Sequence, residues 1–325
     1  MGAGTDQLSA PTRTIDGLSA IIDTFDAVLL DQWGVLHDGA RAYPLAIETL
    51  QRLKRAGKTI IVLSNSGKSG EDNAKRIVSM GFDGAAIDAV VSAGDDARDA
   101  ILHPDEDFHR ALGSRCLLFA RPADAALGDG LGVSVTLAGN DPLAAGVVDS
   151  VDFLLVMSMD APAQSVARWA PLLERAALRE LPMVCGNPDL ARVSPGGTLY
   201  EAPGLVAKRY AELGGQVRWH GKPHARIYRH CLRLIEARLA ECLPGALPRA
   251  LPGLARGRVL AIGDSLHHDV LGAREAGLAS LLIAGGVHRD AICDPHCGAI
   301  DPHAAARLFE REQICPDWLA PSFRW

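Results

Sequence analysis

The sequence lacks a long apolar run, and residues 1–19 lack a basic segment followed by an apolar one. A membrane-spanning helix needs roughly 20 consecutive, mostly apolar residues. A secretory signal peptide needs a basic start and an apolar stretch behind it. We therefore expect no membrane segment and no export signal, and predict a cytoplasmic protein.

An excess of basic residues and an even set of cysteines are also missing. The formal net charge is −6, which argues against nucleic-acid binding because contacts to a phosphate backbone need concentrated Lys and Arg. The seven cysteines are an odd number without regular spacing, so we expect reduced thiols. The 325 residues, 48% hydrophobic and 22% charged, are typical of a globular protein long enough for two domains.

The hydrophobic pattern predicts alternating strands and helices. The first unit has a strand at 27–31, a helix at 44–56, a strand at 59–64 and a helix at 71–80. From Ser64 to Lys222 there are 158 positions, whereas one strand-helix-strand crossover takes about 30. We therefore predict a doubly wound parallel α/β core, residues 1–83 and 204–325, with an inserted α/β cap domain, residues 84–203. The main domain is expected to resume with a helix at 204–213 and a strand at 216–221.

Polar residues follow four of the predicted strands: Asp31, Ser64, Lys222 and Asp264. Acids at the carboxyl ends of parallel strands meet at one edge of a sheet. Two carboxylates there can hold Mg²⁺, which prefers oxygen ligands and usually keeps waters and a substrate phosphate. A hydroxyl and a lysine can bind phosphate oxygens, and a free carboxylate can attack phosphorus. The pattern therefore indicates phosphoryl transfer from a small phosphorylated metabolite.

Three further motifs extend these strand ends: Ser64-Asn65-Ser66-Gly67-Lys68-Ser69, Asn187-Pro188-Asp189 and Gly221-Lys222-Pro223. Together with Asp31 and Gly263-Asp264-x4-Asp269, they resemble the haloacid dehalogenase superfamily, whose members are mostly Mg²⁺-dependent phosphohydrolases. The details are similar to its class IIA, the sugar and para-nitrophenyl phosphate phosphatases, which carry a large α/β cap. The resemblance covers nearly the whole chain and implies a Rossmann-like core with that cap inserted.

The resemblance also implies a role for each matching position. Asp31 is similar to the nucleophile and Lys222 to the lysine that neutralises the nucleophile and the phosphate. The Mg²⁺ site is expected to use Asp31, the backbone carbonyl of Trp33, Asp264 and, as an acid that orients the metal through water, Asp269. Phosphate and substrate contacts are expected from Ser64, Asn65, Ser66, Asn187 and Asp189. For Asn187-Pro188-Asp189 a plain turn is an equal alternative.

Trp33 is a departure from the family pattern. The phosphatases have Asp-x-Asp, whose second acid protonates the leaving oxygen, but this chain has Asp31-Gln32-Trp33. An indole cannot transfer a proton in that role. His37, His267 and His268 are the alternatives that we consider for it.

Two other functions stay open. A catalytically weakened binding or regulatory protein would keep the metal and phosphate pocket without the acid. Metal-free dehalogenation at carbon would fit an aromatic residue after the nucleophile, although the retained Asp264 and Asp269 argue against it. The substrate and the oligomeric state are not readable, and a homodimer contact through Trp318, Phe323 and Trp325 is an alternative to simple packing. The Cys/His-rich segment 288–303 lacks ordered zinc-ligand pairs, so we expect an ordinary surface loop.

Overall fold

The computed structural model describes residues 11–139, 142–193, 198–241 and 257–325. These residues divide into two compact units. The first comprises 1–61 and 232–325, and the second comprises 62–231. The chain passes between the units within strand β3 and helix α7, so the boundaries predicted at 83/84 and 203/204 stay predictions. None of the helices in the described part of the chain combines the length and apolarity needed to cross a membrane.

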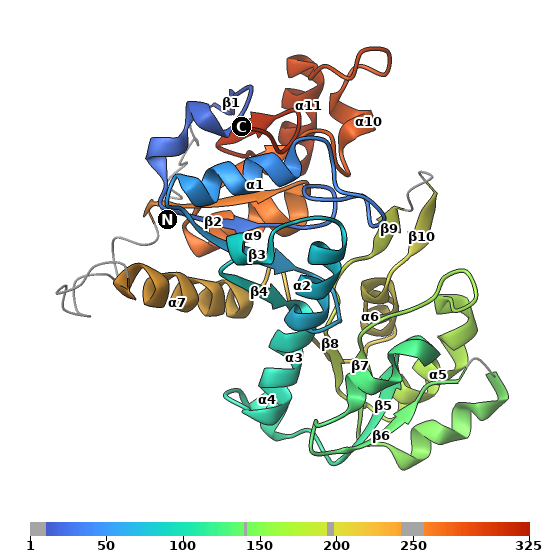
Figure 1. The fold of residues 1–325 in the computed structure, drawn as a ribbon. Helices are drawn as coiled ribbons and strands as arrows, with labels where there is room; N and C mark the ends of the chain where they lie inside the picture. The colour runs from blue at the N-terminus through green and yellow to red at the C-terminus, as the bar shows by residue number, and fades with distance from the viewer. Residues whose placement is uncertain (1–10, 140–141, 194–197, 242–256) are drawn as a thin grey trace, which may run out of the picture. The chain divides into compact units, whose positions relative to one another are not determined.

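The first unit is built on a parallel sheet. Its strands follow the order β1-β14-β13-β12-β2-β3, and Figure 1 shows β1 in blue and the C-terminal segment in red within this unit. The strands are β1 (Arg13–Thr14), β2 (Ala27–Leu30), β3 (Thr59–Ser64), β12 (Val259–Gly263), β13 (Ala279–Ile283) and β14 (Trp318–Ala320). The helices are α1 (Ala46–Arg55), the π-helical turn η7 (Leu266–Val270), α9 (Leu271–Ala276), α10 (Arg289–Ile292) and α11 (Pro302–Glu312).

Burial explains why these strands are continuous apolar runs. All four residues of β2 and all five of β12 are buried, as expected for central parallel strands covered on both faces. Residue Ile262 pairs with Leu30 in the register between the two strands. The next residues of each strand are therefore neighbours, and these lead directly into Asp31 and Asp264.

The second unit contains a second parallel sheet, in the order β11-β8-β7-β5-β6, and an antiparallel pair, β10-β9. Its strands are β4 (Ala89–Ser92), β5 (Arg115–Phe119), β6 (Ser134–Leu137), β7 (Phe153–Val156), β8 (Met183–Cys185), β9 (Ala191–Val193), β10 (Leu199–Glu201) and β11 (Val217–Trp219). Its helices are α2 (Gly70–Ser79), α3 (Ala93–Leu102), α4 (Asp107–Arg110), α5 (Val166–Leu178) and α6 (Pro203–Glu212), and α7 (Ala225–Glu241) leads back to the first unit.

Polar caps and an apolar face explain the helices of this unit. The Ser69 hydroxyl accepts a hydrogen bond from the Asp72 N–H and caps α2, and Ser165 caps α5 in the same way through Arg168. Trp169 of α5 and Tyr210 of α6 are fully buried in the same core cluster as the apolar residues of β7 and β8. The second sheet is therefore packed as an α/β layer of its own.

These observations confirm the predicted α/β class, a parallel sheet of the doubly wound type with a second α/β unit. One strand lies elsewhere than expected. The strand predicted at 216–221 pairs as β11 with β8 of the second sheet, where Arg218 faces Val184 in the register. The residues of β11 are half-buried, as fits an edge strand, and helix α6 packs beside it.

Candidate functional site

Three buried carboxylates gather at the carboxyl ends of β2 and β12 in the first unit. Asp31 follows β2 and its N–H donates to the Ile262 carbonyl at 2.9 Å, while Asp264 follows β12 and Asp269 lies in η7. One carboxylate oxygen from each of the three lies within 4.8 Å of the others. The structure therefore brings these three predicted acids close together.

Backbone N–H groups orient two of these carboxylates. The Val287 N–H donates to Asp264 Oδ2 at 2.8 Å, and the Ser265 N–H donates to Asp269 Oδ2 at 3.1 Å. Each of these hydrogen bonds uses Oδ2 and restricts the rotation of the carboxylate. The main chain therefore holds both carboxylates in a fixed orientation.

Glycines let the main chain approach the carboxylates closely. A Cβ on Gly34, which has φ +83°, would lie 1.9 Å from Asp264 Oδ2, and one on Gly286 would lie 2.2 Å from the same oxygen. A Cβ on Gly263 would lie 1.9 Å from Asp269 Cγ. Any side chain at these positions would occupy the place of the acids. A compact set of three oxygen donors fits a hard divalent cation such as Mg²⁺.

Trp33 packs within its own loop. Its ring meets that of His37 edge to face at a centroid distance of 5.7 Å. A Cβ on Gly39, which has φ +93°, would lie 2.2 Å from Trp33 Cη2, and the Gly39 N–H donates to His37 Nδ1 at 3.0 Å. His37 is fully buried. His37, one of the three histidines considered as proton donors, is therefore in direct contact with Trp33.

His267 and the Cys/His-rich segment have other contacts. His267 Nε2 lies 3.0 Å from a Glu312 carboxylate oxygen, and His288 Nε2 accepts a hydrogen bond from the Leu266 N–H at 3.2 Å. In the described residues, one group of three or more His, Cys, Asp or Glu side chains is close enough to share a cation, and it is the cluster of three aspartates.

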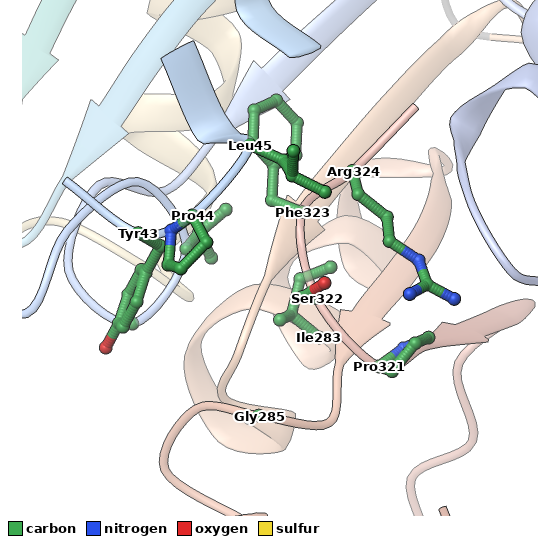
Figure 2. Close-up of a pocket in the computed structure, with 11 residues that line it drawn as sticks. Tyr43, Pro44, Leu45, Ile283, Gly285, Pro321, Ser322, Phe323 and Arg324 are labelled. Carbon is green, nitrogen blue, oxygen red and sulfur yellow. The ribbon is translucent and has the colours of Figure 1, made fainter. Parts of the chain in front are cut away.

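Figure 2 shows a pocket of the first unit. Its lining includes Gly34, the glycine that approaches Asp264. Gly34 and Val35, the segment from Tyr43 to Leu45, and the C-terminal segment from Pro321 to Arg324 contribute to its wall. Burial raises the pKa of the Tyr43 phenol, and the negative charges of Asp264 and Asp38 raise it further. Tyr43 therefore stays protonated at neutral pH and can serve as a hydrogen-bond donor near the cluster.

A second group of predicted site residues meets in the second unit, around the Asn65 amide. Asn65 Oδ1 accepts the Lys222 N–H at 2.7 Å. Its Nδ2 donates to Asp189 Oδ1 at 2.9 Å and to the Lys222 carbonyl at 3.3 Å. Asn65 and Lys222 are both buried. The Asn65 amide therefore joins its own turn to two segments, at Asp189 and Lys222, that lie more than a hundred positions further along the chain.

The loop after β3 is shaped by its own hydroxyls. The Ser66 N–H donates to Ser64 Oγ at 3.1 Å, and the Lys68 N–H donates to Ser66 Oγ at 3.2 Å. These short side-chain-to-backbone bonds form a compact turn. Asn187 plays the same part before Asp189, whose N–H donates to Asn187 Oδ1 at 3.2 Å. This hydrogen bond is the kind expected if Asn187 is a turn residue.

Gly221 is required immediately before the lysine. It has φ +90°, which favours glycine, and a Cβ there would lie 2.7 Å from Asn65 Oδ1 and 2.6 Å from Ala93 Cβ. The motif Gly221-Lys222 therefore has a local reason: only glycine lets the lysine backbone reach the Asn65 amide.

Sequence reasoning missed a buried polar network next to Lys222. His220 Nδ1 lies 2.8 Å from Asp96 Oδ2, and its Nε2 lies 3.1 Å from His109 Nε2. Arg226 Nε lies 3.1 Å from Asp96 Oδ1. Burial, together with the neighbouring His220, lowers the pKa of His109 to about 4. Only the position of His220, two residues before Lys222, could have drawn attention to it.

Comparisons with known proteins agree with this architecture. Residues 28–134 match a family described as haloacid dehalogenase-like hydrolase, and residues 219–322 match the related family described as HAD-hydrolase-like. Chronophin of Homo sapiens is 28% identical over 291 residues, which cover 84% of this chain and 85% of chronophin.

Two solved structures cover nearly the whole chain. A haloacid dehalogenase-like hydrolase from Brucella suis 1330 is 28% identical, with a TM-score of 0.73 over 95% of this chain and 99% of that one. A possible sugar phosphatase of Cytophaga hutchinsonii ATCC 33406 has a TM-score of 0.71 at 18% identity, over 95% of this chain and 98% of that one.

Proposed function

Because this chain belongs to the haloacid dehalogenase-like hydrolases and is a phosphohydrolase, we propose that it hydrolyses a small phosphate monoester, a sugar phosphate, in a Mg²⁺-dependent reaction on Asp31. The observation that carries the proposal is the gathering of Asp31, Asp264 and Asp269 within 4.8 Å. The choice of sugar phosphates rests on resemblance, including that to the possible sugar phosphatase.

In this proposal Asp31, Asp264 and the Trp33 carbonyl would hold the cation, and Asp269 would help to orient it. The bound cation would offset the repulsion between these carboxylates and an incoming phosphate. An Asp31 oxygen attacks phosphorus while the bond from phosphorus to the leaving oxygen breaks, and the leaving oxygen takes up a proton from solvent and departs as the alcohol. Water then attacks phosphorus, the bond to Asp31 breaks, and phosphate leaves.

The second group of residues binds the phosphate in this proposal. The hydroxyls of Ser64 and Ser66 are donors for phosphate oxygens, and Lys222 adds a fixed positive charge. The Asn65 amide and Asp189 support the proposal through their contacts, because they hold the backbone of Lys222 beside the turn.

A panel of sugar, nucleotide and aryl phosphates tests the function. We expect phosphate release with Mg²⁺, none with EDTA, and none from Asp31→Asn in either condition. Asp23→Asn, which neutralises an exposed aspartate of the same unit, is the matched control and should keep full activity. Release that persists in EDTA would contradict the metal-dependent mechanism and favour hydrolysis at carbon instead.

The packing of Trp33 favours a second candidate, a catalytically weakened phosphate-binding or regulatory protein. The indole packs over Gly39 and against His37, at the sequence position that carries an acid in the phosphatases that this chain resembles. General acid-base catalysis is worth about 10²–10⁴-fold in rate. If the acid is simply missing, Trp33→Asp should raise phosphate release by a factor in that range. Loss of an existing activity in Trp33→Asp would instead show that the wild-type chain uses a different proton donor.

A further inference from the structure

A cluster of charges in the second unit has no part in the proposed function so far. Arg121 binds the Asp124 carboxylate through two hydrogen bonds, from Nε at 2.6 Å and from Nη2 at 2.9 Å. The Ser158 hydroxyl donates to the same carboxylate at 2.8 Å, and Lys68 Nζ lies 3.5 Å from it. Asp124 is 7% exposed, whereas the side chains of Lys68 and Arg121 are 40% and 35% exposed. The acid is therefore buried beneath two accessible cations.

The cluster stands where α/β sheets bind ligands. In the order β11-β8-β7-β5-β6, the chain runs from β5 to β6 on one side and returns to β7 on the other, so the order reverses between β5 and β7. Ligands of open parallel sheets bind outside the carboxyl ends of the strands at such a reversal. Arg121 comes shortly after β5 and Ser158 shortly after β7. The Arg121 N–H donates to Ser158 Oγ at 3.1 Å and bridges the two strand ends.

The turn that carries Ser64 and Ser66 reaches the same place. A Cβ on Gly67 would lie 2.0 Å from the carbonyl oxygen of Met157, the residue directly after β7. Gly94 locks the other side of the turn, since its N–H donates to the Ser66 carbonyl at 3.0 Å. Lys68 then extends from this turn to Asp124. The turn assigned to phosphate and the reversal point of the second sheet are therefore neighbours within one unit.

The cluster carries a surplus positive charge. Burial opposes ionisation of Asp124, but hydrogen bonds from Arg121 and Ser158 and the nearby cations hold its pKa below the usual value. Asp160 and Arg76 also lie within electrostatic range of Arg121, so two negative charges face three positive ones. A guanidinium has five N–H donors, and the two bonds to Asp124 leave three of them for a ligand. A lysine ammonium has three donors, of which the contact with Asp124 uses one.

We propose that Lys68 and Arg121, held by Asp124, recognise a carboxylate on the substrate in addition to its phosphate, so that the preferred substrates are phosphorylated carboxylic acids. This rests on the proposed function for the place of the phosphate. The forked guanidinium suits a planar carboxylate, which it can bind through two parallel hydrogen bonds. Asp124 fixes the direction of that fork, and the positive charges of Lys68 and Arg121 disfavour a substrate that presents a cation.

Binding to the Asp31→Asn protein separates this inference from turnover. Calorimetry would compare 3-phosphoglycerate with glycerol 3-phosphate, which differ in a carboxylate against a hydroxymethyl group. A hydrogen bond to a charged group is worth about 1.5–3 kcal/mol, so we expect roughly tenfold to hundredfold tighter binding of 3-phosphoglycerate. Lys68→Gln and Arg121→Gln, each added to Asp31→Asn, should each reduce this preference at least fivefold and leave glycerol 3-phosphate almost unchanged.

Two control variants match these substitutions. Lys75→Gln removes an exposed lysine paired with Glu71, and Arg115→Gln removes an exposed arginine paired with Asp152. Both should keep the preference. Equal affinity for the two ligands, including no detectable binding of either, would overturn the inference, as would an equal loss for both ligands in Lys68→Gln. Phosphate release by the wild-type protein tests hydrolysis separately, because a retained preference without any release would contradict only the proposed reaction.

Discussion

The Asn65 amide offers a sharp test of how the turn after β3 and the Lys222 segment are joined. Asn65→Asp keeps the oxygen that accepts the Lys222 N–H but replaces the donor toward Asp189. Two carboxylate oxygens would then face each other at the present 2.9 Å. Coulomb's law gives a repulsion of about 6 kcal/mol between the two charges at an effective dielectric constant of 20. Because Asp189 is only half-buried, water screens this charge pair, and we expect the repulsion to be about half as large.

The reciprocal change should rescue the loss. Asp189→Asn alone makes the acceptor of this hydrogen bond neutral and should lower the free energy of unfolding by about 1 kcal/mol. In the double variant Asn65→Asp/Asp189→Asn the direction of the hydrogen bond is reversed, with the new amide donating to the new carboxylate. The repulsion disappears, although the bond to the Lys222 carbonyl stays lost. We therefore expect a coupling energy of about 3 kcal/mol between the two positions.

Urea unfolding of the four proteins measures this coupling, and phosphate release from each shows whether the Lys222 segment recovers. Asn73 provides the control. It is a buried asparagine of the same unit whose Nδ2 donates to the backbone carbonyls of Lys68 and Ser69. Asn73→Asp should destabilise the protein, and Asp189→Asn should not rescue it. A coupling energy near zero for the Asn65 and Asp189 pair would refute the reasoning.

Two further predictions concern charge in the two units. With Mg²⁺ at about ten times its dissociation constant, binding should stabilise the protein by about 1.4 kcal/mol and raise Tm by a few degrees. In scanning calorimetry Asp264→Asn should lose this shift in Tm. A shift equal to that of the wild type would contradict the metal site. The pKa of His109 falls from 6.5 to about 4 on folding, so the unfolded chain binds more protons and stability should decline by up to about 3 kcal/mol as pH falls from 6.5 to 4. The midpoint of urea unfolding against pH should be flatter in His109→Asn, and an unchanged slope would show that another group is responsible.

Much of the first unit follows from the sequence because its signals are local. A continuous apolar run such as Val259–Gly263 predicts a central parallel strand, and the polar residue behind it marks the carboxyl end. Since adjacent parallel strands end at the same edge, the pairing of Ile262 with Leu30 was enough to bring Asp31 and Asp264 together.

The sequence could not determine which sheet a short strand joins, or which side chains meet across distant segments. Only three residues of β11 form a strand, and its edge position beside β8 depends on the packing of α6 rather than on any pattern within it. Hydrogen bonds such as those from Asn65 to Asp189 and from His220 to Asp96 join positions more than a hundred residues apart. The charge cluster at Asp124 forms only where the turn between β3 and α2 meets the ends of β5 and β7. Periodicity and capping determine an element from its own residues, but the partners of a polar side chain are decided by tertiary packing, because they lie on elements that only the folded chain brings within hydrogen-bond distance.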